Sequence, residues 1–142
     1  MSYASADNLT QRYGVRLVEQ LTDRATPPAG TVDAAVVAAA LADADAVIDG
    51  YLAARYILPL AGVPPLLTDL AGAIAIYKLH SFAPDPKIDQ DYKDAIVALD
   101  RIARGIIRLP LAGVSPAGSP LSGVETVDRD RPFSADNLHG FI

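Results

Sequence analysis

Two clusters of aspartates are the first candidates for chemistry, because closely spaced carboxylates can hold a metal ion. Asp43, Asp45 and Asp49 match the start of a calcium-binding loop. That loop needs an oxygen ligand at its fifth position and a glycine at its sixth, where this chain has Val47 and Ile48. On a helix, Asp43 and Asp45 would also point about 200° apart. We therefore expect a solvated helix flank here and no metal site.

The second cluster consists of Asp85, Asp89, Asp91 and Asp94. Lys93 falls where a metal ligand would be required, so we expect no metal here either. Acidic side chains in the first turn of a helix are stabilised by the positive end of the helix dipole. The cluster is better explained by that role.

The usual catalytic constellations are missing from the sequence. His80 and His139 have no partner at metal-ligand spacing, and no serine stands in a Gly-x-Ser-x-Gly elbow. The chain has no cysteine, which excludes disulfides and thiolate sites. Gly113, Gly118 and Gly123 lack the basic residue of a phosphate-binding loop. We expect neither an enzyme nor a cofactor-binding protein.

Arginines provide the more informative charges. Arg101, Arg104 and Arg108 would follow one helical face near a helix C-terminus, where the dipole favours cations. A solvated helix end is the simpler interpretation, and a basic patch for an acidic partner or for passing DNA is the functional one. Arg55 continues the apolar stripe of the longest predicted helix, so its guanidinium must reach past the helix end or pair with a carboxylate.

The elements that would position these residues are helices. Alanine-rich stretches favour helix, and apolar residues recur at spacings of three and four. Ser5 or Asp7 can cap the first helix, and Thr31 can cap the longest one. On the longest helix we expect Val37, Leu41, Ala44, Ile48 and Tyr51 to face inward, and on the next one Leu66, Leu70, Ala73, Ile74 and Tyr77. The predicted helices are Asn8–Tyr13, Val15–Thr22, Val32–Tyr56, Leu66–Phe82 and a last one that starts at Asp89 or Asp91 and ends at Gly105.

The last third of the sequence looks different. Residues 110–142 contain four prolines and four glycines and show no helical period. We expect an all-α bundle at residues 1–109 and an extended C-terminal arm at 110–142, in which Val124–Val127 could form a short strand. The sequence Leu58–Val63 recurs as Leu109–Val114 after another helix, but two copies do not make a repeat architecture.

Composition narrows the choice of partners. Seventeen acidic residues against twelve basic ones give a net charge of −5, which repels the phosphates of duplex DNA. Residues 8–22 weakly match a helix-turn-helix opening, but no basic recognition helix follows. No signal peptide or membrane-spanning run of about 18 apolar residues is expected.

Three stretches carry a resemblance to a known family. They are residues 43–60, Asp-Ala-Asp-Ala-Val-Ile-Asp-Gly-Tyr-Leu-Ala-Ala-Arg-Tyr-Ile-Leu-Pro-Leu, the opening at 3–14, and the ending Arg-Pro-Phe-Ser at 131–134. The chain resembles a family of small structural proteins of Mu-like tailed phages and prophages. The resemblance implies a helical head–tail connector, or adaptor, that is made in the bacterial cytoplasm and ends in the virion.

Such a connector would form a ring, expected to be dodecameric, beneath the portal protein, and would touch a neighbouring connector or tail protein. DNA would only pass through it. We expect contacts with other subunits or partners at Asp49, Tyr51, Arg55, Tyr56, Arg101, Arg104, Arg108, Phe133, Leu138 and Phe141. A tail terminator or stopper protein is the alternative within the same assembly. A small regulatory DNA-binding protein is the alternative of another class, and it would bind duplex DNA in a salt-dependent way.

Overall fold

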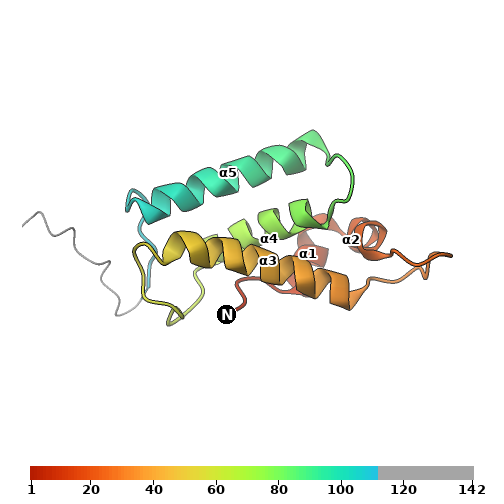
Figure 1. Ribbon diagram of the computed structural model, residues 1–142, viewed down its shortest axis with the longest axis horizontal. Coiled ribbons are helices and arrows are strands. Elements are labelled where there is room, and N and C mark those ends of the chain that lie inside the picture. The colour runs from red at the N-terminus through yellow and green to blue at the C-terminus, as the bar shows by residue number, and fades with distance from the viewer. Residues whose placement is uncertain (112–142) are drawn as a thin grey trace, which may run out of the picture.

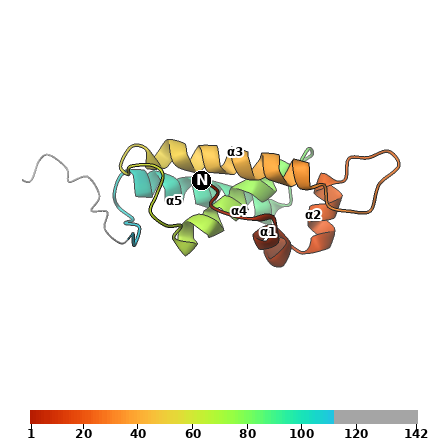
Figure 2. The same cartoon turned by 90° about the horizontal axis from the view of Figure 1, so that it is seen from below.

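The structure is a computed structural model, and it describes residues 1–111. Helices α3 (Ala34–Leu52), α4 (Pro65–Leu79) and α5 (Pro86–Ala103) pack side by side as an elongated body (Figure 1). The short helices α1 (Ala6–Tyr13) and α2 (Val15–Thr22) lie against α3 and α4 (Figure 2). Residues 1–111 contain no β-strand, so the predicted all-α class is confirmed.

The two short helices were well defined by local signals. Ser5 caps α1, accepting a hydrogen bond from the backbone N–H of Asn8 at 3.3 Å, and the Asn8 side chain accepts one from the Ser5 N–H at 2.8 Å. This reciprocal pair starts the helix at Ala6, two residues earlier than predicted. Gly14 has a φ of +86° and separates α1 from α2, as its position between the helices predicted.

Helix α3 is shorter than predicted at both ends. Asp33, rather than Thr31, caps it by accepting hydrogen bonds from the N–H groups of Ala35 and Val36 at 2.9 and 3.3 Å. The helix ends at Leu52 and not at Tyr56, because the chain turns there and the Arg55 N–H bonds back to the Leu52 carbonyl.

Helix α4 is the central element of the body. Every residue from Leu70 to Ile76 is buried, including Gly72, so this stretch is covered on all sides and not only on the predicted apolar face. Pro64 and Pro65 open the helix as predicted. Leu66 was predicted to face the core, but it is 37% exposed, and Leu67 is fully buried in its place. The helix ends at Leu79 and does not reach the predicted Phe82.

Helix α5 starts earlier than predicted. Asp85 caps it, accepting a hydrogen bond from the N–H of Lys87 at 2.9 Å, and Pro86 is its first residue. Proline fits there because the first N–H groups of a helix have no intrahelical partner, so Pro86 begins this helix instead of preceding it. Tyr92 of α5 stacks on Tyr77 of α4 with ring centroids 4.0 Å apart.

The core lies between α3, α4 and α5. Its largest fully buried side chains include Ile48 and Leu52 of α3, Ile74 of α4 and Leu99 and Ile102 of α5. The predicted inward positions Val37, Leu41 and Ala44 are also buried, whereas Tyr51 is half-buried. None of the helices within residues 1–111 is long and apolar enough to cross a membrane.

Candidate interaction surface

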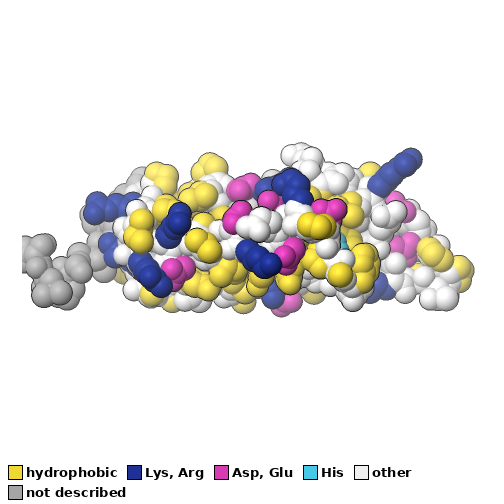
Figure 3. Space-filling view, turned by 90° about the horizontal axis from the view of Figure 1, so that it is seen from above, with side chains coloured by type: hydrophobic (Ala, Val, Ile, Leu, Met, Phe, Trp, Pro, Cys, Tyr) yellow, Lys and Arg dark blue, Asp and Glu magenta, His cyan; other side chains and the backbone are white. Residues whose placement is uncertain are grey.

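The C-terminal ends of α3 and α5 lie together at one end of the body, next to the point where the C-terminal segment begins (Figure 1). Lys and Arg side chains stand beside hydrophobic ones at this end (Figure 3). We call this surface the arginine end and define it by Arg55, Arg101, Arg104, Arg108, Ile57 and Ile106.

Arg101, Arg104 and Arg108 do not all share one helical face, which corrects the sequence prediction. The helix ends at Ala103, and Gly105 turns the chain with a φ of +76°. The N–H of Ile106 bonds to the Arg101 carbonyl at 2.9 Å, and the N–H of Gly105 bonds to the Ile102 carbonyl at 3.0 Å. This pattern is a Schellman motif. Arg108 therefore lies beyond the helix.

Arg104 is the one of these arginines with an ion-pair partner within residues 1–111. Its Nε lies 3.0 Å from the Asp100 carboxylate, one helical turn earlier. An exposed pair of this kind contributes only about 0.3–0.5 kcal/mol. The arginine end therefore keeps most of its positive charge available to a partner.

Arg55 lies three residues beyond the end of α3, so it does not continue the apolar stripe of that helix as predicted. Its guanidinium lies against Gly105, because a Cβ added to that glycine would collide with the Arg55 Cζ. Its Nε is buried without a hydrogen-bond partner, and no carboxylate within residues 1–111 forms an ion pair with it. The cation lies near the C-terminus of α5, where the helix dipole is negative.

Replacing Gly105 with alanine is expected to destabilise the protein. The φ of +76° costs a non-glycine residue about 1–2 kcal/mol, and the new Cβ would also displace the Arg55 guanidinium. In urea unfolding we expect Gly105→Ala to lose about 1–2 kcal/mol. Gly62→Ala is the control, because Gly62 has no positive φ and a Cβ added there would meet nothing within 4 Å. Equal stability of both variants would show that the α5 terminus tolerates a side chain.

Tyr56 holds the start of the C-terminal segment on the body. Its buried hydroxyl oxygen accepts a hydrogen bond from the Leu109 N–H at 3.2 Å. The repeated Leu-Pro-Leu-Ala-Gly-Val motifs meet here, since residues 61–65 and the pair Pro110–Leu111 line one shallow cavity of ≈ 250 Å³. Tyr56 therefore anchors Leu109 to the body through a buried hydrogen bond.

Two exposed isoleucines of the arginine end were missed from the sequence. Ile57 is 84% exposed and Ile106 is 70% exposed. Exposed apolar side chains become informative when they lie together and among charged groups, as in the core and rim of an interface. The available signal was an isoleucine directly after each of the two predicted helices, which were expected to end at Tyr56 and Gly105.

Asp49 and Tyr51 belong to the last turn of α3, and their contacts are made with Tyr3 and with α5 instead of with the arginines. The Asp49 carboxylate accepts a hydrogen bond from the Tyr3 hydroxyl, and Asp45 accepts one from the Tyr3 N–H at 3.0 Å. Burial, and then the bond to Asp49, raise the pKa of Tyr3 well above its usual value. These aspartates therefore fix the N-terminal residues on α3. Tyr51 is half-buried and lines a groove with Tyr92 between α3 and α5.

The remaining predicted contacts, Phe133, Leu138 and Phe141, lie outside the described residues, as does the predicted strand at 124–127. No group of three or more His, Cys, Asp or Glu side chains within residues 1–111 is placed to hold a metal ion.

Comparison with known proteins identifies the family. Residues 3–126 match the family model for bacteriophage Mu Gp36. The chain is 39% identical over 140 residues to the Mu-like prophage FluMu protein gp36 of Haemophilus influenzae, which covers 99% of this chain and 98% of that relative. It is 36% identical over 145 residues to gene product J of Escherichia phage Mu, with 100% of both chains covered. The resemblance seen in the sequence is thereby confirmed, and the chain belongs to the Gp36 family of Mu-like phages and prophages.

Proposed function

We propose that this phage protein is a head–tail connector, or adaptor, that forms a ring beneath the portal and has no catalytic role. The observation that carries the proposal is the arginine end. Ile57 and Ile106 are exposed there, each two residues after an arginine (Arg55 and Arg104), and arginine together with apolar side chains is a common composition of protein interfaces. A ring subunit also needs two different surfaces, one for each neighbour.

The arginine end lies where the C-terminal segment begins. Leu109 is buried and bonded to Tyr56, and the chain continues from Leu111. A partner that contacts the arginine end can therefore also contact residues 112–142. In the virion this partner would be the portal protein or the neighbouring connector, and DNA would pass through the ring without specific contacts.

Deletion of residues 128–142 tests the proposal in an infected cell. We expect the truncated protein to fold, because the core described above lies within residues 1–111. Heads should then fill with DNA but fail to join tails, as counted by electron microscopy. Normal numbers of infectious particles would contradict the proposal.

The two alternative functions give different results. A tail terminator or stopper would associate with isolated tails or with a neighbouring connector, and purified heads would not retain it. A regulatory DNA-binding protein would shift duplex DNA in a gel, and the shift would weaken steeply with salt. We expect no shift at physiological salt, because the net charge of the chain is −5.

A further inference from the structure

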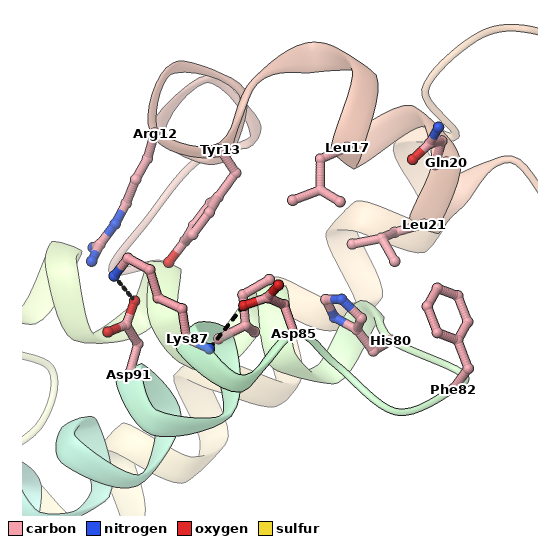
Figure 4. Close-up of a pocket in the computed structure, with 11 residues that line it drawn as sticks. Arg12, Tyr13, Leu17, Gln20, Leu21, His80, Phe82, Asp85, Lys87 and Asp91 are labelled. Atoms are coloured by element: carbon pink, nitrogen blue, oxygen red, sulfur yellow. Dashed lines mark hydrogen bonds and ion pairs between the residues drawn. The ribbon is translucent and has the colours of Figure 1, made fainter.

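A cavity of ≈ 520 Å³ lies between the short helices and the start of α5. Tyr13, Leu17 and Leu21 face it from α1 and α2, and His80 and Phe82 face it from the loop that follows α4 (Figure 4). Its volume is within the range of about 300–1,000 Å³ that is usual for ligand pockets. We call this cavity the socket.

Aromatic and aliphatic side chains form much of the socket lining, together with several charged residues. Phe82 is 66% exposed at its rim and packs edge-on against His80, with ring centroids 5.6 Å apart. The hydroxyl of Tyr13 is buried and has no hydrogen-bond partner among the described residues. The exposed aromatic area carries a free-energy cost that a bound apolar side chain would reduce.

The charges at the rim favour an apolar guest over a phosphate or a nucleic acid. Lys87 forms an ion pair with Asp91 at 2.9 Å, and Arg12 forms one with Asp69. Asp85 adds a further negative charge at the rim. The two cations are therefore already neutralised, and an anionic ligand would meet carboxylates at the mouth.

We propose that the socket binds an apolar side chain from residues 133–142 of this same protein. This stretch has four large apolar residues in ten, namely Phe133, Leu138, Phe141 and Ile142. The proposal goes beyond the connector role, because it places a receptor for the C-terminal segment on the Gp36-family chain itself.

The number of residues between Leu111 and Phe141 is large enough for the C-terminal residues of the same chain to reach the socket. Phe141 is thirty residues after Leu111, and thirty residues of a chain rich in Gly and Ser span about 30 Å on average. Leu111 follows the C-terminus of α5, whereas the socket lies at its N-terminus (Figures 1 and 4). Helix α5, with 18 residues, is about 27 Å long. A linker whose average span matches the distance between two sites gives the highest effective concentration.

Cysteine pairs in the full-length chain test the proposal, because the natural chain has no cysteine. Leu17→Cys with Phe141→Cys places one thiol in the socket and the other on the guest. Val63→Cys with Phe141→Cys is the control, because Val63 is exposed and lies beside Leu111. A segment that only tethers Phe141 to Leu111, with no binding site for it, would bring the Phe141→Cys thiol to the nearby Val63→Cys thiol more often than to Leu17→Cys. We expect the socket pair to form its disulfide at least about tenfold faster under mild oxidation.

A second readout covers the case in which Leu17→Cys disturbs folding. The chain has no tryptophan, so Phe82→Trp would report on the socket alone. We expect a blue-shifted emission that moves to the red when Phe141→Ser and Leu138→Ser are added. A disulfide within one chain supports the proposal, whereas a disulfide between two chains would assign the guest to a second copy of the protein and overturn it. Equal rates for the two cysteine pairs, together with an unchanged emission, would overturn it. Neither measurement involves the portal, so a failure here would not be confused with a failure of the connector role.

Discussion

Replacing Ile74 with alanine is expected to lower the free energy of unfolding by about 2–5 kcal/mol, the usual cost of truncating a fully buried isoleucine. Ile74 is 0% exposed on α4, the helix that contacts both α3 and α5. The cavity left behind would be lined on all sides, because the surrounding α4 residues are themselves buried. Urea unfolding of the full-length chain, followed by circular dichroism, measures the loss.

The matched control is the same substitution at Ile106. That side chain is 70% exposed at the arginine end, so Ile106→Ala should change stability by less than about 0.5 kcal/mol. Similar losses for both variants would mean that α4 is not the centre of the core.

The second large effect concerns partner binding. Changing Ile57 and Ile106 together to glutamate is expected to weaken capture by the portal at least about 30-fold, because a central apolar contact in an interface is worth about 2 kcal/mol or more. Both side chains are exposed in the isolated chain, so folding should be preserved. Surface-immobilised portal protein and a titration of each variant measure the affinity.

Val15→Glu serves as the control for that experiment. Val15 is 56% exposed, but it lies at the start of α2, away from the arginine end. We expect its portal affinity to stay within about threefold of the natural chain. Equal weakening by both changes would indicate a general effect of added negative charge and would remove the special role of Ile57 and Ile106.

The features that the sequence predicted well depend on neighbouring residues. The Ser5 cap and the turn at Gly14 arise within a few residues, and α2 was predicted at its observed bounds. The all-α class followed in the same way from alanine content and helical spacing. These signals act through backbone conformation and short-range hydrogen bonds, which need no tertiary contacts.

Other boundaries were wrong because two local signals competed. Thr31 and Asp33 are both suitable caps, and the N–H of Asp33 also donates to the buried Thr22 hydroxyl at 3.1 Å. That contact joins residues from two different helices, so the local sequence could not rank the two caps. Pro86 was treated as a helix stop, although proline at a first helical position starts a helix equally well.

The site itself depends on contacts between distant residues. The hydrogen bonds of Tyr3 to α3 span more than forty positions, and so does the contact of Arg55 with Gly105. The exposure of Ile57 and Ile106 also follows from how two helix ends meet. Sequence reasoning identified the arginines as charges of interest, but it could not determine that α3 and α5 end on the same side of the body.

The mass of the purified protein, measured by light scattering alone and after mixing with the portal protein of the same phage, is the most direct test of the connector proposal. The proposal predicts a ring-sized species or a stable complex with the portal. A protein that stays monomeric and does not bind the portal would contradict it.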